Sequence, residues 1–241
     1  MDIDEKADKQ WNVIYRIGAI SALIVVSLAL LDIIIGTSLG GDLTALPKTA
    51  VDRFNQFHQN PLLGLYCLDL LNIVNQIIFI PAYVALYAVH RKGGGAYALM
   101  GLVIFLVGTT IFVATNTALP MLELSGKYFT ATTEAQKAWL AGAGEAMVAR
   151  GAHGSPGAFI GFVLPNIAGL VMSLAMLRGG VFGKPTSYVG LFGSALILVY
   201  LVIVTFVPAA KTMAMGIAAP GGIALMAWMV MFARRLFQIS R

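Results

Sequence analysis

Charged residues are scarce in this chain of 241 residues, where only 11% are Asp, Glu, Lys or Arg. Soluble globular domains carry roughly a quarter. Hydrophobic residues make up 59% of the sequence, and the mean hydropathy is +0.83. A soluble core cannot bury so much apolar surface, so the composition excludes a soluble globular fold. It predicts an all-α polytopic membrane helical bundle, with residues 1–241 forming a single integral membrane domain.

Cysteine and the short motifs of soluble enzymes are also nearly absent. Cys67 is the single cysteine, which excludes an intrachain disulfide and a cysteine-based metal site. The chain has no phosphate-binding P-loop, no His-Glu-x-x-His motif, no Gly-x-Ser-x-Gly motif and no dinucleotide-binding glycine pattern. We assign no residue to a metal or a cofactor, and the identity of any cofactor stays open. Chemistry, if there is any, must come from polar groups inside the membrane.

Apolar stretches near 20 residues recur between polar connections, as a hydrocarbon layer of about 30 Å requires of spanning helices. The sequence predicts about six transmembrane helices, at 13–36, 62–89, 96–119, 157–177, 187–207 and 212–232. With this even number, ten of the 16 Lys and Arg residues fall on the side of the two termini. The positive-inside rule therefore predicts cytoplasmic N and C termini.

The basic residues stand in ones and twos at the ends of apolar segments, so topology explains the net charge of +5. We expect membrane lipids and no nucleic acid as partners. The short spans and the distribution of Lys and Arg are typical of a bacterial cytoplasmic (inner) membrane.

Two longer connections, 40–61 and 120–156, fall on the outer side in this topology and have helical patterns. Thr133 and Gln136 have the spacing of a capping box. An apolar stripe at helical intervals follows, made of Trp139, Leu140, Ala143 and Met147. We expect short amphipathic helices that lie along the membrane surface or fold over the mouth of the bundle.

The strongest polar cluster lies in the second expected span, in LYCLDLLNIVNQIIFIPAY. Asp69, Asn72 and Gln76 fall at i, i+3 and i+7, which places them on one face of a continuous helix. Asp69 is then expected roughly 10 Å below the outer end of the span. Ionisable groups inside a span are costly, so they are candidates for function.

The candidate residues share a position in the outer half of the expected bundle. The candidate acid–base residues are Asp69, Asp32 and Glu123. The candidate ligand-binding residues are Asp69, Asn72, Gln76, Asn116 and Asn166. Packing is the alternative interpretation, because amides between membrane helices often act only as interhelical hydrogen bonds worth about 1 kcal/mol or less.

The three histidines have no spacing typical of metal ligands. His58 and His153 fall in the outer connections, where we expect surface or loop-packing residues. His90 precedes Arg91 and Lys92, so it is expected at the membrane interface.

Several segments together resemble a known family. WNVIYRIGAISALI opens the first expected span, LLNIV lies in the second, and SLAMLRGGVF followed by SYVGLFGSALIL extends across the fourth and fifth. In these segments the chain resembles a bacterial multi-pass membrane family catalogued only as a domain of unknown function. The resemblance implies a helical bundle of six or seven spans with no established activity, and it assigns no catalytic residue.

Three hypotheses follow from the intramembrane polar residues. The first is a protein that binds or helps to transport a lipophilic or small ligand in an outward-opening polar pocket. The second is an intramembrane enzyme that uses Asp69 as acid or base on a lipid or isoprenoid substrate. The third is a structural subunit or assembly factor, either a homo-oligomer or part of a larger membrane complex, in keeping with its glycine-rich helices.

Overall fold

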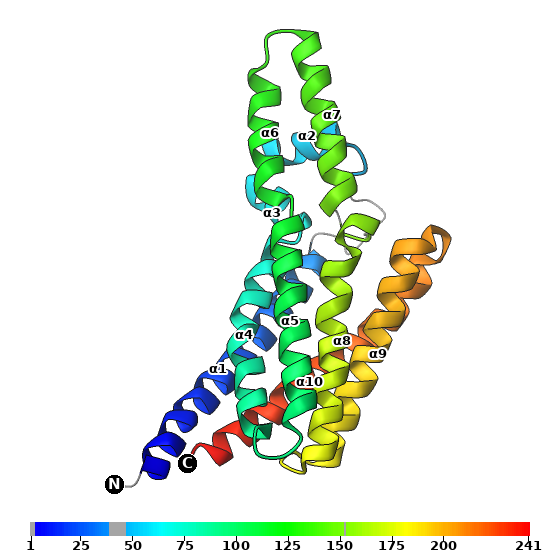
Figure 1. Ribbon diagram of the computed structural model, residues 1–241. Coiled ribbons are helices and arrows are strands. Elements are labelled where there is room, and N and C mark those ends of the chain that lie inside the picture. The colour runs from blue at the N-terminus through cyan, green and yellow to red at the C-terminus, as the bar shows by residue number, and fades with distance from the viewer. Residues whose placement is uncertain (1–2, 39–46, 152) are drawn as a thin grey trace.

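The chain forms a long helical bundle with a helical extension at one end (Figure 1). The computed structural model describes residues 3–38, 47–151 and 153–241, and within them it contains helices and no strand. The helices are α1 (Ile3–Ser38), α2 (Ala50–Gln59), α3 (Pro61–Cys67), α4 (Leu70–His90), α5 (Gly95–Thr115), α6 (Ala118–Thr130), α7 (Glu134–Gly151), α8 (Pro156–Gly179), α9 (Lys184–Phe206), the 3-10 helix η1 (Pro208–Ala210) and α10 (Lys211–Ile239).

Six helical segments of the described chain are long and apolar enough to cross a membrane, which confirms the expected bundle of about six spans. They are Gln10–Gly36, Leu70–His90, Gly95–Thr130, Glu134–Gly179, Lys184–Phe206 and Thr212–Ile239. The chain is therefore an integral membrane protein. The helix α1 begins, and α10 ends, at the same end of the bundle (Figure 1). We call this the terminal end, and the opposite end the distal end.

The six spanning helices form a closed ring in chain order. Contacts join α1 to α4, α4 to α5, α5 to α8, α8 to α9, α9 to α10 and α10 back to α1. Small residues allow close approach: Gly18 lies against Ala85, and Gly108 lies against Pro165, so that neither glycine has room for a side chain. Small residues at such contacts are the usual means of packing helices in a membrane. This ring surrounds the interior in which the candidate site lies.

The expectation of one continuous helix over 62–89 is wrong. The segment is divided into α3 and α4, and the helix breaks at Leu68 and Asp69. Asp69 adopts the left-handed conformation, with φ 64° and ψ 23°, which no helix interior tolerates. Asp69 therefore stands at the distal end of α4 and not about 10 Å inside a span.

A separate group of helices extends from the distal end of the ring (Figure 1). We call α2, α3, α6 and α7 the distal cap. Its own apolar core is built around Phe54, Phe57, Leu68 and Met121, with Ala50 and Ala118 filling the gaps. Because this core does not merge with the core of the spanning helices, the cap is a second packing unit on top of the bundle.

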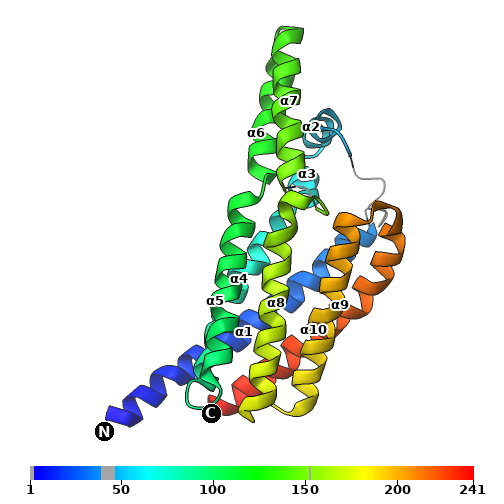
Figure 2. The same ribbon diagram turned by 45° about the vertical axis from the view of Figure 1, so that its right-hand side comes forward.

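The helices α6 and α7 form a hairpin that extends beyond the bundle (Figures 1 and 2). The expectation of helices in the long connection is confirmed, but the expected orientation along the membrane surface or over the mouth of the bundle is wrong for this hairpin. The reason is that α6 follows α5 after a short break at Asn116 and Thr117, and α7 leads into α8 in the same manner. The hairpin thus continues two spanning helices outward.

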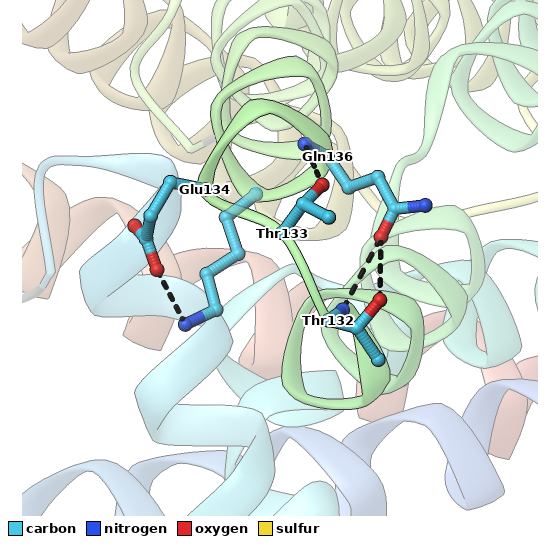
Figure 3. A network of polar contacts seen from close by, with 5 residues as sticks. Thr132, Thr133, Glu134 and Gln136 are labelled. Atoms are coloured by element: carbon cyan, nitrogen blue, oxygen red, sulfur yellow. Dashed lines mark hydrogen bonds and ion pairs between the residues drawn. The ribbon is translucent and has the colours of Figure 1, made fainter.

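The turn at the tip of the hairpin has the expected capping contact (Figure 3). The backbone N–H of Gln136 donates to the Thr133 hydroxyl at 3.2 Å. The Gln136 side chain accepts from the backbone N–H of Thr132, also at 3.2 Å, in place of the reciprocal bond to Thr133. An exposed Lys137–Glu134 ion pair at 3.1 Å completes the first turn of α7. These contacts explain where α7 begins.

The buried face of α7 matches the stripe that the sequence predicted only in part, at Met147. Trp139 is 76% exposed, whereas Met147 and Val148 pack on the core of the distal cap. Gly144 is buried, and a Cβ placed there would lie 2.6 Å from the Phe54 ring. A tryptophan that projects from the hairpin cannot anchor α7 against the bundle, so glycine, and not the aromatic residue, sets the contact with α2.

We predict opposite effects for two neighbouring glycine substitutions in α7. Gly144→Ala lowers the free energy of unfolding by about 1–3 kcal/mol, because the added methyl group overpacks the contact with Ala50 and Phe54. Gly142 has no atom within 4 Å of such a methyl group, so Gly142→Ala is neutral or stabilising by up to about 1 kcal/mol. Thermal unfolding of the purified protein in detergent measures both, and equal destabilisation would contradict this packing.

Candidate functional site

A cavity of about 250 Å³ lies inside the ring of spanning helices. All six helices contribute to its wall, including Val25 from α1 and Leu225 and Met229 from α10. Its polar lining consists of Asn72, Asn75, Gln76, Asn166 and Ser194. Its aromatic lining consists of Phe79, Tyr83, Phe105, Phe162 and Trp228. The ring thus encloses a space of mixed polarity in an otherwise apolar bundle.

Polarity changes along the wall that α4 provides. Asn72, Asn75 and Gln76 lie in the first two turns of this helix, near the distal end, and Phe79 and Tyr83 follow toward the terminal end. The Tyr83 ring stacks on Phe105, with 3.9 Å between the ring centroids. At 1.5 Å per residue the graded wall is about 16 Å long. The cavity therefore has an amide-rich distal half and an aromatic half closer to the termini.

Two polar atoms of the cavity wall are buried without a hydrogen-bond partner in the described part of the chain. They are Oδ1 of Asn75 and Oγ of Ser194. The Gln76 side chain, in contrast, accepts from the Thr109 hydroxyl at 3.2 Å, and the Asn166 amide donates to the Phe162 carbonyl at 2.9 Å. Buried polar atoms normally find partners, so the two exceptions mark positions where a further polar group fits.

Asp69 lies at the distal end of this cavity, in the break between α3 and α4. Its left-handed backbone costs about 1 kcal/mol, and its own carbonyl accepts the first backbone bond of α4, from Ile73 at 3.1 Å. The carboxylate oxygen Oδ1 accepts from the Asn72 amide at 2.8 Å. The second oxygen, Oδ2, is buried without a partner among the described residues. Asn72 thus connects a buried carboxylate to the cavity wall.

His153 joins Asp69 to a helix on the far side of the ring. Its Nδ1 lies 3.3 Å from Oδ1 of Asp69, and its Nε2 lies 2.9 Å from the Tyr200 hydroxyl of α9. The imidazole of His153 also packs edge-on against the phenyl ring of Phe162, which lines the cavity, with 5.1 Å between the ring centroids. Gly154, with φ 75°, provides the turn after the histidine, a conformation that glycine adopts without strain. Asp69, His153 and Tyr200 therefore form a continuous polar chain.

Two further charged residues act on Asp69. Arg53 of α2 is only 4% exposed and interacts electrostatically with Asp69 and Cys67. Burial lowers the pKa of this guanidinium, while the neighbouring carboxylate opposes that shift. Asp32 of α1 interacts electrostatically with Asp69 and His153, and its backbone carbonyl accepts from the Tyr66 hydroxyl at 3.1 Å. The distal end of the cavity is thus a charged cluster that includes both signs.

The predicted site residues fall into four groups, of which the last is Glu123 alone. Asn72, Gln76 and Asn166 line one cavity, and Asp69 and Asp32 belong to the charged cluster beside it. Asn116 lies in the break between α5 and α6, where its amide donates to the Leu68 carbonyl at 2.7 Å. Asn116 therefore holds two helix breaks together and does not reach the cavity wall.

Glu123 is the candidate that the structure separates from the others. It lies on α6 with a side chain 69% exposed and pairs with Lys127 at 2.6 Å. The structure therefore does not bring Glu123 to Asp69. Within the described residues, no group of three His, Cys, Asp or Glu side chains is arranged to hold a metal ion.

Sequence reasoning missed His153, Tyr200 and Arg53. His153 was expected to be a surface or loop-packing residue, yet its two partners lie 84 and 47 residues away in the sequence. Helical spacing reveals only neighbours on one helix, so it could not find these contacts. The one usable signal was a histidine and a glycine immediately before the apolar segment that forms α8. His90, expected at the interface, is fully buried at the terminal end and stacks on Phe182.

We predict energetic coupling between Asp69 and His153. Asp69→Asn keeps a residue that tolerates the left-handed backbone, and His153→Gln keeps a polar group. Each change lowers the free energy of unfolding by about 1–2 kcal/mol, because a hydrogen bond to a charged group is lost. In the double variant the free energy of unfolding falls by about 1 kcal/mol less than the sum of the two single losses.

The matched control for this cycle is His58→Gln. His58 stacks on the Phe129 ring in the distal cap and makes no contact with Asp69. Its effect therefore adds to that of Asp69→Asn within about 0.5 kcal/mol. Denaturant unfolding in detergent measures all variants, and strict additivity of Asp69→Asn with His153→Gln would refute the coupling.

Comparison with known proteins gives a family and no activity. No curated protein and no solved structure matches the chain. A family model described as a domain of unknown function, DUF4386, matches residues 17–232, which include four spanning segments entirely, most of the first and last, and every residue that lines the cavity. The match covers most of the chain, in agreement with the resemblance seen in the sequence. The chain therefore belongs to the DUF4386 family.

Proposed function

We propose that this protein binds a small amphipathic molecule in the central cavity, either to retain it or to help it across the membrane. The observation that carries the proposal is the pair of unpaired buried atoms, Asn75 Oδ1 and Ser194 Oγ, on opposite parts of one cavity wall. A buried polar atom without a partner costs about 1–3 kcal/mol. A ligand that supplies a hydrogen-bond donor to both atoms would recover that free energy.

The cavity restricts the chemistry of this ligand. Its volume of about 250 Å³ lies just below the roughly 300–1,000 Å³ typical of sites for drug-sized molecules. The graded wall favours a polar group directed toward Asn72 and Asn75 and an apolar or planar part against Tyr83, Phe105 and Trp228. These features support a small molecule with a polar head and a hydrophobic body.

The expected topology gives the direction of access. We place both termini in the cytoplasm of a bacterial inner membrane, because ten of the 16 Lys and Arg residues fall on the terminal side. The distal end, with Asp69, His153 and the distal cap, is then on the outer side. At about 1.5 Å per residue, α4 and α5 are each about 32 Å long, close to the thickness of the hydrocarbon layer. The charged cluster would therefore lie at the outer boundary of the bilayer, between the outside and the cavity.

An intramembrane enzyme is the second candidate, favoured by the two contacts of His153 with Asp69 and Tyr200. A carboxylate that orients an imidazole, which in turn meets a hydroxyl, is an arrangement used in acid–base chemistry. Asp69 would act as the acid or base, and His153 and Tyr200 would carry the proton away from it. A lipid or isoprenoid substrate would need to enter the cavity through the wall of helices.

We predict that a compound copurifies with the protein and that Ser194→Ala lowers its occupancy. Loss of one hydrogen bond corresponds to an affinity about 3- to 10-fold weaker. Ser187→Ala is the matched control: Ser187 lies on the same helix, is equally buried and also has no partner among the described residues, but it does not line the cavity. Mass spectrometry of organic extracts measures the molar ratio of compound to protein.

Two outcomes of this experiment would contradict ligand binding. One is the absence of any compound at a defined ratio in the wild-type extract. The other is an equal loss of compound in both serine variants, which would point to packing alone.

Asp69→Asn distinguishes the two candidate functions. If the protein only binds its ligand, the copurified compound remains chemically unchanged during incubation with wild-type protein and with the variant. If the protein is an enzyme, wild-type protein converts the compound and Asp69→Asn reduces the rate by about 100-fold or more, as loss of a general acid or base does. Mass spectrometry over time measures the conversion.

A further inference from the structure

A second hollow lies at the opposite end of the molecule from the charged cluster. It is an open groove of about 680 Å³ between α1 and the C-terminal part of α10. Its lining includes Arg16, Leu23, Val230, Arg234, Phe237 and Arg241. We call it the arginine groove. It shares no lining residue with the central cavity.

The groove has a basic end and an apolar end. On α1, Arg16 and Leu23 are seven residues apart, which is two helical turns on the same face. On α10, Val230, Arg234 and Phe237 follow one another at intervals of four and three residues, which also places them on one face. The two helices run in opposite directions, so the arginines of both gather at the terminal end. Leu23 and Val230 lie one to two turns deeper toward the middle of the bundle.

No acidic side chain of the groove balances its positive charge. Arg16 donates to the backbone carbonyl of Ser240 at 2.9 Å, an interaction that leaves its charge unneutralised. Arg234 and Arg241 are exposed and form no hydrogen bond or ion pair with the described residues. No acidic side chain is among the residues that line the groove. Three guanidinium groups therefore face one open space.

The deeper part of the groove has the surface expected toward lipid tails. Leu23 is 38% exposed and Val230 is 43% exposed, although both belong to spanning segments. In a bilayer this exposed apolar area contacts hydrocarbon. A single molecule that fits both parts needs an anionic head near the arginines and a hydrophobic chain that extends inward.

We propose that the arginine groove binds an anionic phospholipid from the leaflet at the terminal end of the bundle. The phosphodiester group accepts charge-assisted hydrogen bonds from Arg234, Arg241 and the free N–H groups of Arg16. One acyl chain lies along Leu23 and Val230. Basic pockets between spanning helices are known to take anionic headgroups, and each nearby Lys or Arg contributes about 1 kcal/mol. This site is independent of the ligand in the central cavity.

Titration of the full-length protein with phosphatidylglycerol, followed by native mass spectrometry, tests the proposal. We expect phosphatidylglycerol to bind more tightly than phosphatidylcholine. Arg234→Gln with Arg241→Gln weakens binding about 25-fold, since about 1 kcal/mol per arginine corresponds to a factor of about five. Neither side chain makes a polar contact within the described chain, so the variant keeps the wild-type unfolding temperature.

Arg235→Gln is the matched control. Arg235 is next to Arg234 in the sequence, is equally exposed and carries the same charge. Its side chain does not line the groove: it donates to the Val181 carbonyl at 3.0 Å and to the side-chain oxygen of Gln238 at 3.4 Å. This variant retains phosphatidylglycerol binding within about twofold, because the charge removed does not face the lipid.

Three results would overturn the proposal. The first is equal affinity for phosphatidylcholine, and the second is equal weakening of binding by Arg235→Gln. Either result means that the groove does not bind the anionic lipid specifically. The third is displacement of the lipid by glycerol 3-phosphate, which carries the phosphate without acyl chains. That result would assign the groove to a free phosphate compound.

Discussion

Backbone N–H and C=O groups at a membrane must find partners inside the protein, and this requirement is severe where three long helices break at one level. The breaks separate α3 from α4, α5 from α6, and α7 from α8 (Figure 1). They satisfy one another: Asn116 donates to Leu68, and Arg150 donates to the Ala114 carbonyl at 2.9 Å. The chain therefore leaves the bundle at one shared junction.

The polar cluster is a consequence of this junction. Because the helices break there, Asp69 and His153 stand outside regular helix and can approach each other from different segments. Arg53 reaches the same place from the distal cap, and Asn72 continues the contact into the cavity wall. A charge buried in this way is tolerated only with partners, and the junction supplies three, His153, Arg53 and Asn72. The distal cap and the cavity are thus mechanically and electrostatically connected.

The two ends of the bundle differ in the burial and the pairing of their charged side chains. At the distal end, both signs are buried together and satisfy one another in part. At the terminal end, arginines of the groove are exposed and uncompensated by neighbouring side chains. Burial of a charge in the protein requires a partner, whereas an exposed charge at the interface is hydrated or meets an anionic headgroup. The asymmetry is consistent with a molecule that has a fixed orientation in its membrane.

Hydrophobic length alone was sufficient to predict the class of the fold. Six apolar stretches with polar connections leave no other way to satisfy the backbone in a bilayer, so the number of spans was correct. The helices α5, α8 and α9 begin within three residues of the expected starts. The errors were at Leu68 and Asp69 and in the hairpin of α6 and α7. An apolar sequence fits a continuous helix and a broken one equally well, so hydropathy could not detect those breaks.

The sequence by itself determined which residues are costly inside a membrane, among them Asp69, Asn72, Gln76 and Asn166, because a polar group that leaves water loses its hydration in any arrangement of helices. Only the tertiary structure decided which of them meet. Contacts between Asp69 and His153, or between Arg16 and Ser240, join residues 84 and 224 positions apart. Such contacts depend on how the ring of helices closes, and no local pattern encodes that closure.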